Sequence, residues 1–192
     1  MDLALMSQVP LSLEADWRSE PSKLITTYLS SWLFEQGSLT SKLKRHCSDF
    51  KVKILAKHQR NLSAKELTLF GYASDESVTV QVREVLLYCD GNPWVYAQTL
   101  MPLSDIPPAV VKLTTLGEKP LGEVIFNEPG VIRSAIEVAE FDRSSEVVQL
   151  AAEVAQTADV VRELWARRSM FTLEGYSLLV AEVFLPDAEV YQ

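Results

Sequence analysis

The sequence predicts an α+β fold, in which an antiparallel sheet is covered by helices. Residues 77–100 alternate around the pair Asp90-Gly91, and within residues 169–186 two further strand-like segments flank the pair Glu174-Gly175. Both pairs suit the positive φ of tight turns, so two β-hairpins are expected. Helical segments separate the strands without a strand–helix–strand repeat, which favours antiparallel pairing.

Length and composition indicate one globular domain. A chain of 192 residues suffices for a single core, and 47% hydrophobic with 23% charged residues argues against disorder. We expect one domain over residues 1–192, with a loose segment over residues 1–20, and we expect a monomer.

Helical periodicity or capping marks three segments. Residues 21–34 place apolar side chains at helical intervals, with Pro21 suited to the start and Gly37 to the stop. Residues 38–47 predict a short basic helix that is capped by its first serine. Residues 145–164 predict a longer amphipathic helix.

Shorter elements lie between these helices. Strict alternation predicts a strand over residues 50–57, and a serine before residues 64–69 predicts a turn of helix. Prolines and glycines bound two short helices over 107–116 and 121–126, and residues 131–138 suggest a strand.

The charge pattern disfavours an anionic surface as a partner. The net charge is -8 and the pI is about 4.8, whereas neutralising phosphates needs clustered Lys and Arg. We therefore expect no nucleic-acid partner. An anionic ligand would have to be held by a few specific cations.

No targeting or metal-binding pattern is evident. The N-terminus lacks the order of a secretion signal, and no apolar run reaches the roughly 20 residues of a membrane span. Cys47 and Cys89 lack CxxC spacing, and His46 and His58 leave no ligand set for zinc. We expect reduced thiols, a cytoplasmic location, and neither a metal nor a membrane partner.

Arg83 is unusual in a strand that is otherwise rich in Val and Leu. With Asp90-Gly91 at the turn, it is expected to face Gln98 across the hairpin. A guanidinium buried there is unfavourable unless a negative group meets it. A structural carboxylate such as Glu182 or Glu84 is one candidate, and the carboxylate of a ligand is the other.

Glu182 interrupts an almost continuous apolar run in the last strand. The turn at Glu174-Gly175 places it opposite Arg167, so a cross-strand ion pair is one interpretation. The other is a proton donor or hydrogen-bond acceptor in an apolar pocket. Together, Arg83 and Glu182 could bind the two ends of a small polar molecule.

The common catalytic motifs GxSxG, HExxH, GxxxxGK[ST] and GxGxxG do not occur in the sequence. An enzyme built on this chain would work with carboxylates, guanidinium groups and backbone amides. We expect no cofactor.

Four segments, in order and with matching spacing, resemble the chorismate lyase family. They are EQGSLTSKL (35–43), REVLLYCDGNPWVYAQTLMP (83–102), LGEKPLGEVIF (116–126) and LWARRSMFTLEGYSLLVAEVFLP (164–186). The resemblance covers most of the chain from about residue 35. It implies a ligand pocket enclosed under helical flaps. It also implies a lyase that removes pyruvate from chorismate and leaves 4-hydroxybenzoate for quinone biosynthesis.

By the same analogy, Arg83 binds the ring carboxylate of chorismate and Glu182 meets its 4-hydroxyl group. Backbone groups of Leu39 and Leu121 complete the site from the two flaps, and Gln98 is expected to donate hydrogen bonds to the substrate.

The chain departs from the family at Gln98, where many members have a second arginine. Since chorismate carries two carboxylates, Arg133, Arg167 or Lys119 is then the candidate to bind the second one. The helix predicted over 145–164 also looks longer than its counterpart in the family.

Three other interpretations stay open. A ligand-sensing domain of the same fold would bind a small molecule without converting it. A related chorismate-converting enzyme would release a different product, such as 3-hydroxybenzoate. A scaffold in which Arg83 and Glu182 form a buried structural pair would bind no ligand.

Overall fold

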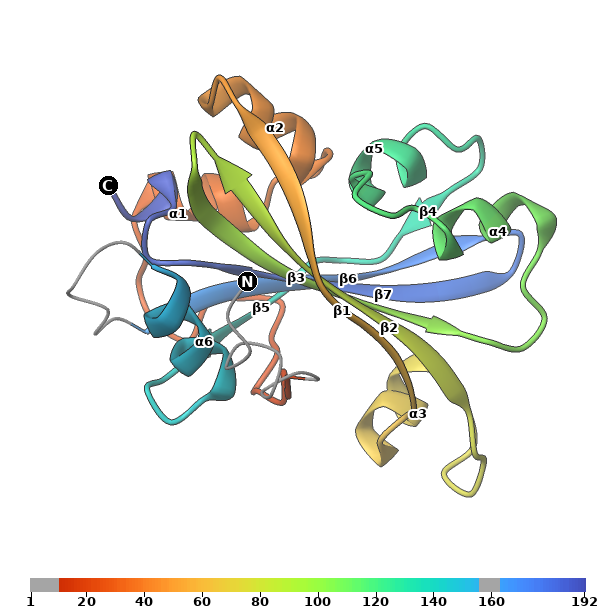
Figure 1. Ribbon diagram of the computed structural model, residues 1–192. Coiled ribbons are helices and arrows are strands. Elements are labelled where there is room, and N and C mark those ends of the chain that lie inside the picture. Colours follow the sequence, from red (N-terminus) through yellow and green to blue (C-terminus); the bar gives the residue numbers. More distant parts are fainter. Residues whose placement is uncertain (1–10, 156–162) are drawn as a thin grey trace.

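The computed structural model describes residues 11–155 and 163–192 (Figure 1). Within these residues, seven strands form one antiparallel sheet in the order β1-β2-β3-β7-β6-β4, and β5 also pairs with β6. The strands are β1 Phe50–Asn61, β2 Thr79–Cys89, β3 Asn92–Pro102, β4 Ile132–Arg133, β5 Glu137–Phe141, β6 Leu164–Leu173 and β7 Tyr176–Phe184. The predicted α+β class with an antiparallel sheet is confirmed.

Both predicted hairpins are present and turn where the sequence indicates. Asp90 and Gly91 have φ values of 49° and 83°, and Glu174 and Gly175 have 51° and 80°. Glycine adopts this left-handed region without steric cost, which explains the second position of each turn. Strands β2, β3 and β7 occupy neighbouring positions in the sheet and are mostly buried.

Helices cover both faces of the sheet. They are α1 Thr27–Leu33, α2 Leu39–His46, α3 Ala64–Phe70, α4 Pro108–Thr114, α5 Leu121–Ile125 and α6 Glu146–Val154, followed by a 3-10 turn over Glu189–Tyr191. In Figure 1, α1, α2, α4 and α5 lie on one side of the strands, and α3 and α6 lie on the other. None of the helices in the described residues is long and apolar enough to cross a membrane.

The core is divided by the sheet. On one face, Trp32 of α1 and Leu43 of α2 pack with Val85 of β2. On the other face, the apolar side of α6 packs against Leu86 and Tyr96. Alternation along the strands produces this division, because successive side chains point to opposite faces.

Several predicted boundaries are wrong. The first helix begins at Thr27, because the Thr26 side chain accepts a hydrogen bond from the Leu29 N–H, whereas Pro21 supplies no such cap. The strand expected over 131–138 is divided between β4 and β5, which pair separately with β6.

The amphipathic helix expected over 145–164 is also shorter than predicted. It ends at Val154, and Leu164 already belongs to β6. The part of that prediction over residues 156–162 lies outside the described residues. Pairing of Leu164 with Phe141 in the sheet competes with a helical continuation there.

The segment expected to be loose makes defined contacts where it is described. Leu11 is 3% exposed, and Arg18 forms an isolated β-bridge with Val138. Residues 1–10 of that prediction lie outside the described residues.

Cys47 and Cys89 form a disulfide, so the prediction of reduced thiols is wrong. Cys47 directly follows α2, and Cys89 is the last residue of β2. Pairing of β1 with β2 sets Phe50 opposite Cys89, which returns the chain after α2 to the end of β2. The two Cα atoms are therefore only 5.4 Å apart, a distance that suits a disulfide.

The register of the first hairpin also differs from the prediction. Arg83 pairs with Thr99, and Glu84 pairs with Gln98. An irregularity between Leu87 and Tyr88 shifts the pairing by one residue. Such a shift changes which side chains share a face of the sheet, so Arg83 and Gln98 lie on opposite faces.

Candidate active site

A pocket lies between the sheet and the first turns of α2 and α5. Its apolar wall comes from the sheet and includes Val85, Ala97, Val180 and Phe171. The charged groups in its lining are three arginines and one glutamate, namely Arg83, Arg133, Arg167 and Glu182. The open volume of the pocket is about 40 Å³, so the lining side chains nearly fill the pocket.

Arg83 is a buried cation that faces this pocket from β2. Its Nη2 donates hydrogen bonds to the carbonyl oxygens of Gly117 at 2.8 Å and Lys119 at 3.1 Å, in the loop before α5. Its Nε is buried without a hydrogen-bond partner. No carboxylate of the described chain lies within ion-pair distance, and burial lowers the pKa of Arg83.

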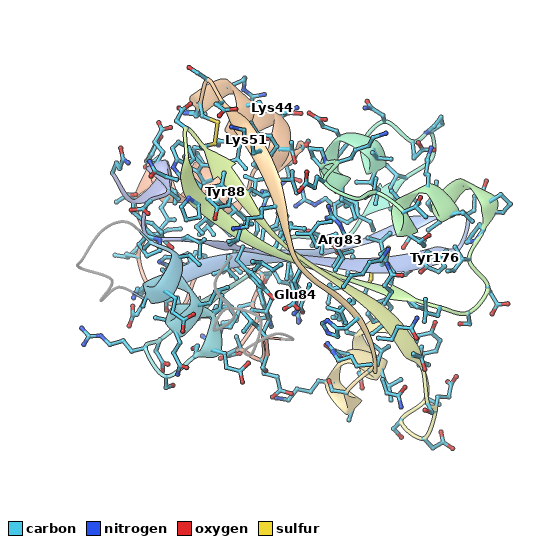
Figure 2. The ribbon with its side chains drawn as sticks, viewed as in Figure 1. Lys44, Lys51, Arg83, Glu84, Tyr88 and Tyr176 are labelled. Atoms are coloured by element: carbon cyan, nitrogen blue, oxygen red, sulfur yellow. A yellow bond between two sulfur atoms is a disulfide. The ribbon has the colours of Figure 1, made fainter. Side chains whose placement is uncertain are left out.

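The structural-carboxylate interpretation of Arg83 is therefore wrong. Glu84, its neighbour in sequence, is fully buried on the opposite face, where its carboxylate accepts hydrogen bonds from Tyr96 and the Leu11 N–H. Figure 2 shows Arg83 on the side of the sheet that carries α5 and Glu84 on the side that carries α3 and α6.

Glu182 forms the cross-strand ion pair that the hairpin register predicts. Arg167 Nε donates to Glu182 Oε2 at 2.7 Å, and the two residues are direct partners across β6 and β7. Arg167 is 1% exposed, and its Nη1 also donates to the carbonyl oxygens of Trp32 and Glu35. Within the described chain, Glu182 Oε1 accepts no hydrogen bond, so one oxygen stays free to meet a ligand.

Arg133 reaches the pocket from the short strand β4. Its Nε donates to Ser169 Oγ at 3.0 Å, and its Nη1 donates to the carbonyl oxygens of Glu35 and Gln36. Its guanidinium lies 5.4 Å from the ring centroid of Phe171 and 5.8 Å from that of Phe126. Burial, together with repulsion from Arg167, lowers the pKa of Arg133 to about 10.

The two flap segments contribute helix N-termini. Leu39 and Leu121 are the first residues of α2 and α5, and both line the pocket. The first N–H groups of a helix have no partner within the helix, so they are available to an anion. Gly122 allows the two helices to approach, because a Cβ there would lie 3.0 Å from Ser38 Oγ and 3.1 Å from Thr40 Oγ1.

Of the predicted site residues, the pocket brings together Arg83, Glu182, Leu39 and Leu121. Gln98 lines a different hollow on the other face, where its amide donates to the carbonyl oxygen of Leu11 at 2.9 Å. The one-residue register shift explains this separation. Sequence reasoning missed Thr99, which takes the place opposite Arg83 and lines the pocket.

The candidate cations for a second carboxylate also separate. Arg133 and Arg167 line the pocket, whereas Lys119 contributes only its backbone carbonyl, which binds Arg83. No group of three or more His, Cys, Asp or Glu residues in the described parts of the chain is arranged to hold a metal ion.

Comparison with known proteins places this chain in a family. The family model described as chorismate lyase matches residues 13–192, which is nearly the whole chain. The chain belongs to the chorismate lyase family. It is 42% identical over 189 residues to a protein of Pseudoalteromonas translucida named "Probable chorismate pyruvate-lyase", covering 97% of this chain and all of that protein. A protein of the same name from Psychromonas ingrahamii is 40% identical, with 100% of this chain and 99% of the relative covered.

Solved structures share the fold of this chorismate lyase family member at low sequence identity. The effector domain of PhnF from Mycobacterium smegmatis has a TM-score of 0.55 and 16% identity, covering 79% of this chain and 90% of that domain. A GntR-family transcriptional regulator from Bacillus cereus has a TM-score of 0.50 and 14% identity, covering 73% and 94%. At these identities the similarity concerns the fold alone.

Proposed function

We propose that this protein binds chorismate in the pocket under α2 and α5 and eliminates pyruvate from it, leaving 4-hydroxybenzoate. The observation that carries the proposal is the buried Arg83, which lines the same pocket as Glu182. Within residues 11–155 and 163–192 it has no carboxylate partner, and its Nε has no hydrogen-bond acceptor. A buried guanidinium in this state is costly, and a ligand carboxylate would offset that cost.

In this proposal the ring carboxylate lies against Arg83, where Nε offers an unused donor. The backbone N–H groups of Leu39 and Leu121, at the starts of α2 and α5, add further donors. The 4-hydroxyl group donates to the free Oε1 of Glu182 at the other end. Arg167 holds the Glu182 side chain in place through its 2.7 Å contact with Oε2.

The elimination requires few catalytic groups from the protein. The C3–O bond of the ether breaks, and the electron pair of the C4–H bond enters the ring, which becomes aromatic. One proton leaves C4 and one is gained by the departing enolpyruvate at its methylene carbon, which gives pyruvate. Fixing the reactive conformer and stabilising charge on the departing oxygen are the protein's contributions, and no cofactor is needed.

Entry to the pocket requires movement of the flaps. A pocket for a small organic ligand typically measures about 300–1,000 Å³, far more than the roughly 40 Å³ that is open here. The contacts between α2 and α5 include the half-exposed ion pair between Lys44 and Glu123. Pairs of this kind contribute little stability, so the two flaps can separate at low cost.

The test is to mix purified protein with chorismate, without metal or nucleotide, and to identify products by chromatography. We expect equimolar 4-hydroxybenzoate and pyruvate. Arg83→Gln should lower turnover at low substrate roughly 10- to 150-fold. Arg168→Gln is the matched control, because Arg168 pairs with Glu137 on the opposite face. Release of 3-hydroxybenzoate would assign a different reaction, and binding without turnover would favour a sensor.

The wider setting of the enzyme follows from this activity. We propose that it acts as a monomer in the cytoplasm and supplies 4-hydroxybenzoate for quinone biosynthesis. Gel filtration at assay concentration tests the first point, and restoration of quinone synthesis in a cell lacking its own chorismate lyase tests the last.

A further inference from the structure

We infer that Arg133 binds the second carboxylate of the substrate, the one on its enolpyruvyl side chain. The inference rests on the proposed function and extends it, because it explains how this chain binds a dianion with Gln98 on the far side of the sheet.

The charges in the pocket support a ligand with two negative groups. Its lining holds three guanidinium groups against one carboxylate, an excess of two positive charges. Arg167 is neutralised by Glu182, whereas Arg83 and Arg133 have no carboxylate within ion-pair distance among the described residues. Glu35, which is near Arg133, instead pairs with Lys42 and accepts the N–H of Gly37. Among the described residues, two cations of the pocket therefore lack a carboxylate, and a ligand with two carboxylates would pair with both.

The positions of these cations match the shape of the substrate. The enolpyruvyl ether is attached at C3, next to the C4 hydroxyl and away from the ring carboxylate at C1. With the ring carboxylate on Arg83 and the hydroxyl on Glu182, the side chain must lie at the Glu182 end. Arg133 lies at that end, because Arg133 and Arg167 both donate to the carbonyl oxygen of Glu35.

Arg133 is held in place with donor capacity to spare. Its hydrogen bonds within the described chain use Nε and Nη1, which leaves Nη2 unused. The rings of Phe126 and Phe171 support the guanidinium, and both line the pocket. A fixed guanidinium with an unused N–H is well suited to a carboxylate, because little side-chain entropy remains to be lost.

A contact of this kind distinguishes substrate from product. Once the ether is cleaved, the second carboxylate leaves with pyruvate, and 4-hydroxybenzoate retains only the carboxylate on Arg83. Arg133 therefore contributes to binding of the dianion and contributes little to binding of the monoanionic product.

The experiment compares a monocarboxylate with a dicarboxylate in wild type and Arg133→Gln. Dissociation constants are measured by calorimetry for 4-hydroxybenzoate and for 3-(carboxymethoxy)-4-hydroxybenzoate, which carries a second carboxylate at the ether position. KM for chorismate is measured in parallel. We expect the variant to weaken dicarboxylate binding and raise KM by roughly 10- to 100-fold, with less than about a threefold change for 4-hydroxybenzoate.

Matched variants separate a binding role from a structural one. Arg168→Gln, on the neighbouring strand but on the opposite face, should leave both ligands unaffected. Ser169→Ala removes the bond to Arg133 Nε while keeping the charge, so it should weaken only the dicarboxylate, and by less; it also serves if Arg133→Gln does not fold. Arg83→Gln should weaken both ligands.

The outcomes distinguish this inference from the proposed function. Equal weakening of both ligands in Arg133→Gln, or no weakening of the dicarboxylate, overturns the role of Arg133 even if wild type makes 4-hydroxybenzoate. Loss of the dicarboxylate preference in the variant supports the role even if wild type turns over no chorismate, a result that would instead reject the lyase activity.

Discussion

Arg167 and Glu182 face each other across β6 and β7, with Nε and Oε2 at 2.7 Å, and both line the pocket. The pair differs from Arg83, which lines the same pocket and, among the described residues, forms hydrogen bonds to backbone carbonyl oxygens alone. One arginine supports a carboxylate of the protein, and the other is the group that we propose binds a carboxylate of the ligand.

Arg167 should contribute more than Arg83 to the free energy of unfolding, because Arg167 pairs with a carboxylate of the protein. Arg167→Gln leaves a carboxylate in the pocket without its partner, so we expect a loss of about 3–5 kcal/mol in the free energy of unfolding. Glu182→Gln keeps the side-chain shape. It should lower kcat, and it should lower the free energy of unfolding by less than Arg167→Gln does. Urea unfolding and steady-state kinetics measure the two effects. An Arg167→Gln variant as stable as wild type would show that the pair has no structural role.

Arg83→Gln should change ligand binding more strongly than it changes the free energy of unfolding. Because Arg83 is buried without a carboxylate, its removal should change the unfolding free energy by no more than about 1 kcal/mol. Binding of 4-hydroxybenzoate should weaken roughly 10- to 150-fold, because a charge-assisted contact contributes about 1.5–3 kcal/mol. Calorimetry and urea unfolding test both parts. Unchanged binding would remove Arg83 from the site.

Gly122→Ala should disturb the contact between the two flaps. The new Cβ would lie 3.0 Å from Ser38 Oγ, which caps α2 by accepting the Ser41 N–H. We expect a loss of about 1–2 kcal/mol in unfolding free energy, through crowding and the weakened cap. If the flaps limit product release, the off-rate of 4-hydroxybenzoate should rise, which stopped-flow displacement measures. Gly71→Ala, at the end of α3 on the other side of the sheet, controls for general destabilisation, and an equal off-rate in both variants would count against flap opening.

The capping box of α3 should make stability depend on acid pH. Burial alone would raise the pKa of Glu66, but hydrogen bonds from Arg60 and from the Ser63 N–H outweigh it and lower the pKa below the ordinary glutamate value of 4.5. This contribution is therefore fully present above about pH 4.5 and is lost as pH falls through the lower folded-state value.

Glu66→Gln tests this dependence, because glutamine preserves the cap but not the charge. We expect a loss of about 1–2 kcal/mol at pH 7 that shrinks as the pH falls below the ordinary range for glutamate. Urea unfolding of wild type and variant at a series of pH values provides the measurement. A constant difference between them from pH 7 to pH 3 would exclude the carboxylate as its source.

The hairpins illustrate what local sequence patterns can predict. Strand-like segments on either side of Asp90-Gly91 and of Glu174-Gly175 predict both hairpins, because each hairpin depends on residues that are close along the chain. The same local logic predicts Arg167 opposite Glu182, since no irregularity intervenes between their turn and their pairing. Ser38 and Ser63 mark helix starts for the same reason.

Other features depended on tertiary packing. A single irregularity at Leu87 and Tyr88 moved Gln98 to the far face, and the alternating pattern carries no sign of it. Cys47 meets Cys89 only because β1 pairs with β2. Leu164 joins a strand because sheet pairing outweighs its helical pattern.

The sequence by itself determined the fold class, both hairpins, the family resemblance and the identities of Arg83 and Glu182 as unusual residues in apolar strands. Only the tertiary structure decided which cations lack a carboxylate among the described residues, because Arg133 and Arg167 meet at the carbonyl oxygen of Glu35 from β4 and β6 through long-range packing. Long-range packing decides whether a carboxylate of the protein lies near a buried cation. Among the described residues none lies within ion-pair distance of Arg83 or Arg133, and we propose that a ligand binds both.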